Sequence, residues 1–293
     1  MDSIDSTMIP SDEEINVPCT LGLPESILYY IKNKAHPRFQ LKLMQTSKYF
    51  RFKEFPYSVA RDIGYADYDD TWYFRQNNGT YEDIEILTKP LWITGSIYSV
   101  DAEEDPKAIS DLLSKCAVCD IKKLNLCNQI LTVGEFRMLV SSDNIEKLYY
   151  HNSHIEYDDG SIVWFDEIIK VFPKLKKFGC TFNDKMASTF TPDMTKTMID
   201  YVDTEILEVF IMINIPEAFD FKLFANFMEA NPSIKFRLEW SHSVSDEYTQ
   251  MLQDYVDELI ETSSYKNRKV LICFDCLNYE TLHLLDRRYY SKT

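Results

Sequence analysis

The sequence predicts an α/β protein in which a short helical segment near the N-terminus precedes a solenoid of alternating strands and helices. Three observations support this class. One pattern, an aliphatic residue followed three positions later by Leu or Phe, recurs four times, at Ile121, Ile145, Leu175 and Leu207. Apolar, strand-like runs alternate with helical patterns at least five times along the C-terminal region. Hydrophobic residues make up 45% of the 293 residues, which is ample for a core.

The charge balance narrows the possible partners. The formal net charge is −16 at pH 7, and such a surface repels the phosphates of nucleic acids and anionic membranes. No apolar run approaches the roughly 20 residues of a membrane span, and the first residues lack a secretion signal. We therefore expect a cytoplasmic or nuclear protein with reduced cysteines, no nucleic-acid partner and no membrane partner.

The first residues predict a tail and two helices. Residues 1–18 are polar and acidic, which is typical of a flexible tail. Pro24 suits the first turn of a helix, and Ile27, Leu28 and Ile31 then fall on one face. A second helix would carry Phe39, Leu43, Thr46 and Phe50 at spacings of four, three and four. Two helices of about 30 residues together are too short to bury a core, so they must dock on this chain or on another protein.

This segment also resembles a known family. The residues that carry the resemblance are Leu23-Pro24, Ile27-Leu28, Ile31, Leu43 and Thr46-Ser47-Lys48-Tyr49-Phe50. In this order they resemble the F-box, and most closely the F-box-like families expanded in nematodes. Residues 215–220 and 244–248 resemble stretches of the same families. Two departures stand out: Phe50 lies where the usual closing Trp would fall, and the link at residues 33–38 lacks the usual apolar content.

The resemblance implies a partner and a role. An F-box binds a Skp-family adaptor, which joins it to a cullin complex. The residues implied to face the adaptor are Leu23, Pro24, Ile27, Leu28, Ile31, Leu43 and Phe50. The chain would then be the substrate-recognition subunit of an SCF-type, cullin-RING ubiquitin ligase that binds an unknown target protein. The helix pattern alone leaves an alternative open: a non-catalytic repeat scaffold for protein–protein interaction, without a ligase link, whose first helices cap its own solenoid.

The recurring pattern predicts the strands of the C-terminal domain. Its copies start 24, 30 and 32 residues apart, and further strands are expected at residues 91–97, 234–240 and 269–275. One strand and one helix in roughly 20–30 residues is the plan of a leucine-rich repeat. A standard repeat carries Asn or Cys five positions after its central Leu. Here Asn128 and Asn152 lie four positions after Leu124 and Leu148, and the other units lack the asparagine. We therefore predict an irregular leucine-rich-repeat-like solenoid, with a compact sheet joined by right-handed crossovers as the structural alternative.

Helical patterns with clear ends lie between these strands. Asp105-Pro106 marks one start, and Thr132 with Glu135 has the spacing of a capping box. Asp220 and Ser245 are expected to cap two later helices, the second of which is the longest. The apolar residues expected to face the core include Ile109, Leu112, Leu113, Phe136, Leu139, Phe165, Ile168, Ile169, Phe172, Phe224, Phe227, Leu252 and Leu259.

Four domains follow from these patterns. They are an acidic tail at residues 1–18, an F-box-like segment at 19–55, a connector at 56–90 and the leucine-rich-repeat-like domain at 91–293. In the connector, rings such as Trp72 and Phe74 interleave with aspartates. We predict an irregular connection whose rings pack on the first repeat, rather than an acidic docking loop.

No group of residues predicts catalysis. Cys116-x-x-Cys119 and Cys273-x-x-Cys276 have the inner spacing of zinc ligands, but the two pairs lie far apart in the sequence, so we predict buried thiols. His151 and His154 precede Glu156, a pattern that we interpret as a solvated loop. Glycine-rich phosphate loops and known catalytic motifs do not occur in the sequence. We predict no catalytic residue, no metal, no cofactor and no enzymatic activity.

A target protein would bind the sheet face and the loops at one strand edge. Aromatic and Arg side chains dominate binding hot spots. On this basis the candidate target-binding residues are Tyr149, Tyr150, His151, Asn152, Arg237, Glu239 and Trp240.

Overall fold

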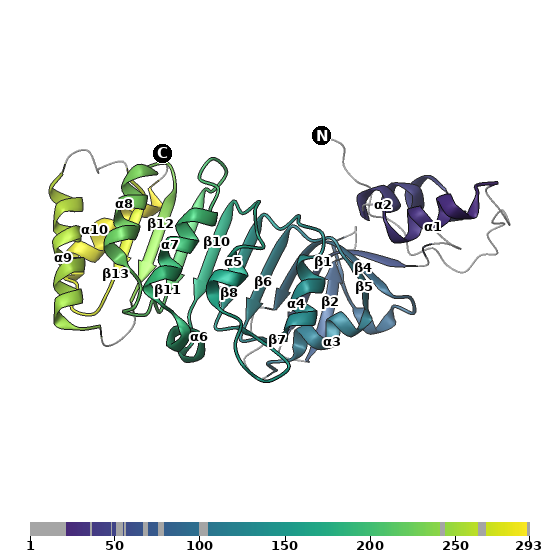
Figure 1. The fold of residues 1–293 in the computed structure, drawn as a ribbon, viewed down its shortest axis with the longest axis horizontal. Coiled ribbons are helices and arrows are strands. Elements are labelled where there is room, and N and C mark those ends of the chain that lie inside the picture. Colours follow the sequence, from purple (N-terminus) through teal and green to yellow (C-terminus); the bar gives the residue numbers. More distant parts are fainter. Residues whose placement is uncertain are drawn as a thin grey trace.

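The computed structural model confirms the α/β class. It describes residues 22–35, 37–47, 49–50, 55, 57–66, 70–75, 79–99, 105–240, 244–262 and 268–291. The predicted tail at residues 1–18 lies outside the described residues. In the described part of the chain, a large sheet runs along the length of the molecule, and the two N-terminal helices lie beyond one end of it (Figure 1).

The large sheet has the strand order β13-β12-β11-β10-β8-β6-β4-β1-β2-β3, with β5 beside β4. All its pairings are parallel except β1 with β2 and β2 with β3. The strands are β1 Ser58–Ala66, β2 Thr71–Arg75, β3 Tyr81–Asp83, β4 Leu91–Ser99, β5 Cys116–Cys119, β6 Lys123–Cys127, β8 Lys147–His151, β10 Lys177–Thr181, β11 Val209–Ile213, β12 Lys235–Glu239 and β13 Val270–Cys273. A second small sheet pairs β7 Ile130–Thr132 with β9 His154–Glu156.

Helices connect most of the parallel strands. They are α1 Glu25–Asn33, α2 Pro37–Thr46, α3 Ala108–Lys115, α4 Val133–Val140, α5 Phe165–Ile169, α6 Asp184–Thr189, α7 Pro192–Tyr201, α8 Phe221–Ala230, α9 Asp246–Glu261 and α10 Tyr279–Tyr290, with the 3₁₀ turn η2 Ile84–Ile86. Helices α4, α5, α7 and α8 lie side by side over one face of the sheet (Figure 1). The opposite face of the sheet is called the outer face below.

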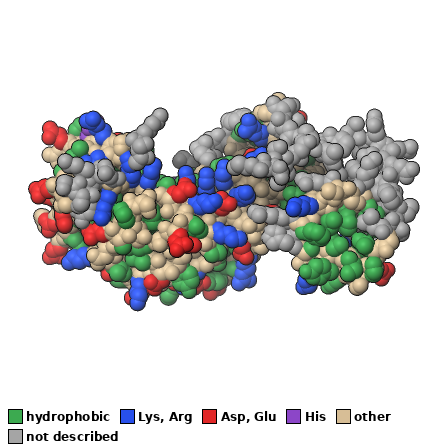
Figure 2. Space-filling view, turned by 90° about the horizontal axis from the view of Figure 1, so that it is seen from above, with side chains coloured by type: hydrophobic (Ala, Val, Ile, Leu, Met, Phe, Trp, Pro, Cys, Tyr) green, Lys and Arg blue, Asp and Glu red, His purple; other side chains and the backbone are tan. Residues whose placement is uncertain are grey.

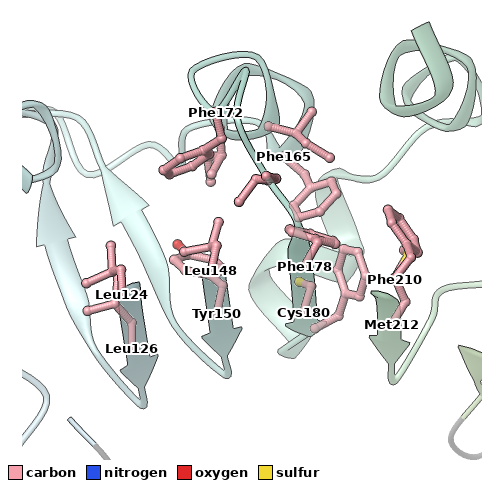
Figure 3. Packing of buried hydrophobic residues seen from close by; sticks show 14 of the residues in the cluster. Leu124, Leu126, Leu148, Tyr150, Phe165, Phe172, Phe178, Cys180, Phe210 and Met212 are labelled. Carbon is pink, nitrogen blue, oxygen red and sulfur yellow. The ribbon is translucent and has the colours of Figure 1, made fainter. Parts of the chain in front are cut away.

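The recurring sequence pattern marks the start of four adjacent strands. Leu124, Leu148, Phe178 and Phe210 occupy the same register position on β6, β8, β10 and β11. All four side chains are buried, as are the aliphatic residues three positions before them. Their strands place these side chains and the next inward ones, such as Tyr150 and Cys180, on the same side as Phe165 and Phe172 of the connecting segment (Figure 3).

Aromatic rings fill much of the space between the sheet and the helices. Phe165 of α5 lies 5.0 Å from Phe182, measured between ring centroids, and Phe210 lies 5.0 Å from Phe178 and 5.2 Å from Phe224 of α8. Full burial of one such side chain contributes about 1.5–3 kcal/mol to the free energy of folding, as an upper estimate. Stacking each strand–helix unit on the next therefore supplies the core that a single unit lacks.

Most predicted strands and helix caps are confirmed. Thr132 and Glu135 form the capping box of α4, and Asp220 and Ser245 cap α8 and α9. The start expected at Asp105-Pro106 is wrong by a few residues, because α3 begins at Ala108. The Asp105 carboxylate instead accepts a hydrogen bond of 2.9 Å from the Lys107 N–H, which makes a turn before the helix.

The predicted irregular connector at residues 56–90 is also wrong in part. It contains β1, which pairs in parallel with β4, and the hairpin β2–β3, which extends the sheet. Trp72 and Phe74 alternate inward along β2 and are buried. The rings do pack on the following unit as expected, since the Trp72 indole N–H donates to the Ala108 carbonyl at 2.9 Å.

Asparagine recurs more widely at the carboxyl ends of the strands than the sequence interpretation allowed. Asn128, Asn152 and Asn214 each follow a strand, each lie four positions after the inward Leu or Phe, and each have a positive φ. Asparagine tolerates this left-handed conformation better than most residues. The prediction that the other units lack the asparagine was therefore wrong for Asn214.

Several elements carry weak sequence signals and were not predicted, namely β5, β7, β9, α6, α7 and α10.

Of the helices in the described residues, none is both long and apolar enough to cross a membrane.

Candidate interaction surfaces

The two N-terminal helices are fastened to each other by a buried amide. The Gln40 side chain on α2 donates hydrogen bonds to the carbonyls of Ile31 and Lys32 at 2.6 and 3.0 Å. These carbonyls lie in the last turn of α1, where the helix itself leaves carbonyl groups without a partner. The relative position of α1 and α2 is therefore fixed by specific contacts.

A small apolar cluster fastens the same helices to the sheet. Its buried members are Ile31, Met44, Tyr49, Phe50, Phe55 and Trp92. Rings continue from Phe50 to Phe55 at 5.7 Å, from Phe55 to Tyr57 at 6.3 Å and from Tyr57 to Trp92 of β4 at 5.7 Å. Ile31 and Phe50, which the resemblance assigns to the adaptor, are 7% and 3% exposed and pack within this chain. Their assignment to an exposed adaptor-facing surface is therefore corrected.

Five other apolar side chains in or next to these helices face solvent. Leu23, which lies two residues before α1, is 40% exposed, and Ile27 and Tyr30, which are three residues apart on one side of α1, are 46% and 58% exposed. Tyr29 and Phe39 are 63% and 48% exposed. We call these five residues the α1–α2 apolar surface, and Figure 2 shows hydrophobic side chains gathered over this end of the molecule. Of the other adaptor-facing residues in the prediction, Pro24 is exposed, and Leu28 and Leu43 are half-buried.

Five of the seven predicted target-binding residues lie on the outer face of the sheet or next to it. Tyr149 and His151 project from β8 on this face, Asn152 follows at the carboxyl end of the strand, and Arg237 and Glu239 project from β12. Tyr150 and Trp240 are 1% and 4% exposed and point into the core. We therefore remove Tyr150 and Trp240 from the candidate binding surface, because alternation along a strand sends neighbouring side chains to opposite faces.

Helix α10 already covers part of the outer face near β12. The Arg237 guanidinium donates to Glu239 at 2.6 Å and to the Tyr290 hydroxyl at 3.4 Å. Lys269, next to β13, donates to the carbonyls of Arg288 and Ser291 at 3.0 and 2.8 Å. Arg237 and Glu239 are thus satisfied within the chain, and the part of the outer face left for a partner lies around β6, β8 and β10.

On β8 the outer face is shaped by one glycine. Tyr149 lies across β10 at Gly179, where an added Cβ would meet the Tyr149 ring at 2.7 Å. The ring also stacks near His151, whose Nδ1 lies 2.8 Å from the Thr181 hydroxyl. Burial lowers the pKa of His151 and raises the pKa of Tyr149, so both side chains are neutral at neutral pH.

A polar pocket of about 600 Å³ lies at the carboxyl edge of the sheet. Its lining is Pro106, Asn128, Ile130, Asn152, His154, Asn183, Asp184 and Lys185. His154 was expected in a solvated loop, but it is buried and belongs to β9. That expectation was wrong for His154 because this residue begins β9, which pairs with β7.

His154 has polar neighbours at both of its ring nitrogens. The Asn183 amide oxygen accepts from the Met186 N–H at 2.8 Å, so the amide nitrogen faces His154 Nδ1 at 3.4 Å as a donor. His154 Nε2 lies 2.9 Å from the Glu156 carboxylate and 3.2 Å from Lys185 Nζ. The hydrogen bonds from His154 and Lys185 lower the pKa of Glu156. His154, Glu156, Asn183 and Lys185 thus contact one another, and we interpret their contacts as stabilising this edge of the sheet.

The cysteine pairs lie in different parts of the sheet. Cys116 and Cys119 are buried on β5 beside β4, whereas Cys273 is on β13 at the far end. The four thiols therefore cannot bind one ion. Among the described residues, no group of three or more His, Cys, Asp or Glu side chains is placed to hold a metal.

Comparison with protein-family models gives no match, and comparison with curated proteins gives none either. The geometry thus defines an α/β protein with two candidate interaction surfaces, the α1–α2 apolar surface and the open part of the outer face.

Proposed function

We propose that this chain is a substrate-recognition subunit of an SCF-type ubiquitin ligase. In this proposal the α1–α2 segment is an F-box that binds a Skp-family adaptor, and the strand–helix units form a leucine-rich-repeat-like domain that binds a target protein. The chain contributes no chemistry of its own. It holds a target lysine close to the conjugating enzyme of the cullin complex and so raises the effective concentration of the reacting groups.

The observation that carries the proposal is the exposure of apolar side chains on α1. Leu23, Ile27 and Tyr30 remain in solvent although neighbouring residues of the same segment pack against Trp92. Contiguous exposed apolar side chains on a small helical pair mark a protein-interaction site. The resemblance of the segment to the F-box gives the identity of the partner, and the segment lies beyond one end of the sheet, away from β8 and β10 (Figure 1).

The proposal is tested by adaptor binding to single-residue variants. Deletion of the whole segment is a poor test, because it also removes Phe50 from the cluster around Trp92. Ile27→Asp places a charge in the α1–α2 apolar surface, where Ile27 is 46% exposed, and leaves the cluster intact. We expect at least about tenfold weaker retention of a purified Skp-family adaptor, measured by pull-down and by calorimetry.

Ile86→Asp is the matched control. Ile86 lies in η2, away from α1 and α2, and is 55% exposed, so the substitution adds the same charge to an equally accessible isoleucine. Adaptor binding should stay at the level of the unmodified chain. Equal binding by both variants, or no adaptor binding by the unmodified chain, would contradict the proposal.

A second candidate function is a repeat scaffold without a ligase link. The observation that favours it is the ring series from Phe50 to Trp92, which docks the N-terminal helices on the sheet as a cap would. In that case the segment stabilises the sheet and binds no adaptor. Unmodified chain that retains no adaptor, combined with a large stability loss for Phe50→Ala, would favour the scaffold.

A further inference from the structure

Lysine recurs at one register position of the outer face. Lys123, Lys147 and Lys177 begin β6, β8 and β10 and are aligned directly with one another across the three neighbouring strands. We call these three residues the lysine row. Neighbouring strands are about 4.8 Å apart, so three cationic side chains start within about 10 Å. Lys235 begins β12 at the same position, beyond Val209 of β11.

Further lysines and only two glutamates border this row. Lys122 and Lys176 lie one residue earlier, as do Glu146 and Glu208. Glu146 pairs with Lys176 at 2.9 Å and Glu208 with Lys177 at 3.7 Å. The hydrogen bond from Lys176, and after it the charges of Lys176, Lys122 and Lys147, lower the pKa of Glu146. Positive charge therefore prevails around this carboxylate.

Two members of the row form no ion pair in the described part of the chain. No described Asp or Glu lies within ion-pair distance of Lys123 or Lys147. Like charges aligned on neighbouring strands destabilise a sheet. The chain as a whole carries a net charge of −16, which makes a concentration of lysine at one place more conspicuous. Folding alone therefore gives no reason for the row.

The row lies on an accessible edge of the sheet. Helix α6 and strand β7, which follow β10 and β6, lie at the lower side of Figure 1, so the strands begin at the upper side. Figure 2 looks onto that side and shows Lys and Arg side chains gathered near its middle, with Asp and Glu among them. The next outward residues toward the carboxyl ends are Asn125 and Tyr149, which offer an amide and a phenol beside the cations.

We propose that the lysine row binds an acidic, extended segment of the target protein. This inference rests on the proposed use of the outer face for target binding. In an extended peptide every second side chain faces the same way, at a spacing of about 6.8 Å. Two acidic residues separated by one residue are thus farther apart than two neighbouring lysines of the row and closer than its two ends, so both carboxylates lie within reach of the row. Carboxylates bound there replace lysine–lysine repulsion with opposite-charge contacts, and Asn125 and Tyr149 supply hydrogen-bond donors nearby.

The probe is a short fluorescent peptide with Glu at every second position and Ser between. Its binding to the full chain is measured by anisotropy. Exposed ion pairs are individually weak and depend on ionic strength. We therefore expect weak but measurable binding that falls at least tenfold between about 0.05 M and about 0.5 M salt. The same peptide with Gln in place of Glu should not bind.

Matched variants locate the site. Lys123→Gln, Lys147→Gln and Lys177→Gln together should weaken peptide binding by about tenfold or more. Lys107→Gln, Lys196→Gln and Lys222→Gln together change the net charge equally at exposed positions of the helical side and should have little effect. Equal losses in the two triple variants would overturn the proposal, as would binding of the Gln peptide. Tighter binding of a single-stranded oligonucleotide than of the Glu peptide would also overturn it, in favour of nucleic acid.

The two proposals fail separately. Adaptor retention is measured on the same preparations and should be unaffected by either triple variant. Peptide binding without adaptor retention would contradict the ligase role and leave the acidic-segment site standing. Adaptor retention without peptide binding would contradict the acidic-segment site alone.

Discussion

Thr132 caps the start of α4 through hydrogen bonds of both its backbone N–H and its side-chain hydroxyl. Its hydroxyl accepts from the Glu135 N–H at 3.2 Å, and the Glu135 carboxylate accepts from the Thr132 N–H at 2.7 Å. Thr191 occupies the corresponding position before α7, but its side chain makes no capping bond. The two threonines therefore share a position and differ in whether the side chain caps the helix.

This pair gives a prediction at the residue scale. Thr132→Ala should lower the free energy of unfolding by about 1 kcal/mol, because the Glu135 N–H loses its acceptor and the Glu135 carboxylate loses the hydroxyl donor. Thr191→Ala should lower it by much less. Urea unfolding followed by circular dichroism measures both changes. Equal losses in the two variants would show that the capping box at Thr132 adds no measurable stability.

Residues whose role depends on the next few positions could be predicted from the sequence. The caps at Thr132, Asp220 and Ser245 are of this kind, because a cap acts on a backbone group three residues away. The faces of Tyr150 and Trp240 were not predicted. Strand alternation is clear only once the first inward residue is known, and a shift of one position exchanges the two faces.

At the scale of elements, the pairing of β1 with β4 contains an irregularity. The register shifts between Ala60 and Asp62 of β1, opposite the stretch of β4 that contains Gly95. A Cβ at Gly95 would collide with the Arg61 carbonyl and with the Asp62 carboxylate. This carboxylate also accepts a hydrogen bond from the Ser96 hydroxyl. The absence of a side chain at Gly95 is what allows the two strands to approach.

Gly95→Ala should therefore destabilise the protein by about 2 kcal/mol or more, since the collision is with backbone and the strands must separate. Gly64→Ala is the control, because Gly64 lies on the same strand pair and has open space around its Cα. Its stability should stay unchanged or rise slightly. Thermal unfolding of the two variants compares them directly. Similar melting temperatures would contradict this account of the irregularity.

The strands and helices that were not predicted have weak local patterns in the sequence. In β1 the buried Ala60 and Ile63 are three positions apart, so its alternation is weak, and β2 has only five residues. The burial of both strands depends on partners such as β4 and Ala108 far along the chain. Helix α7 has Pro192 at its start and buried Met194 and Met198, a short signal between two stronger ones. The strands β6, β8, β10 and β11 could be predicted because the same short pattern of aliphatic and aromatic residues recurs at the start of each.

At the scale of the whole molecule, the sheet has one end closed by a helix. Strand β13 ends the strand order, and α10 packs on it through Leu285 and Tyr289, which are 0% and 7% exposed. Arg288 of α10 also donates to the Leu259 carbonyl in α9 at 3.2 Å. Helix α10 therefore covers apolar side chains at the end of the array that would otherwise invite association.

Removal of residues 279–293 should make the chain self-associate. The deletion uncovers apolar side chains on the outer face of β13, such as Leu271, which is aligned with Arg237 and 3% exposed, and such a surface favours association of chains. Light scattering over a range of protein concentrations detects this association. Tyr279→Ser, at a position of α10 that is 77% exposed, is the control and should leave the oligomeric state unchanged. A deletion variant that behaves like the control would show that α10 is not protective.

The alignment of β6, β8, β10 and β11 without any shift in register has a consequence for how such a chain can change over evolutionary time. Each strand presents its neighbours with the same backbone pattern, so the tandem duplication or loss of one strand–helix module leaves the hydrogen bonding on either side compatible. Lengthening the array in this way would alter how far a bound protein lies from the N-terminal helices. The span of the molecule can thus evolve independently of the site at its end.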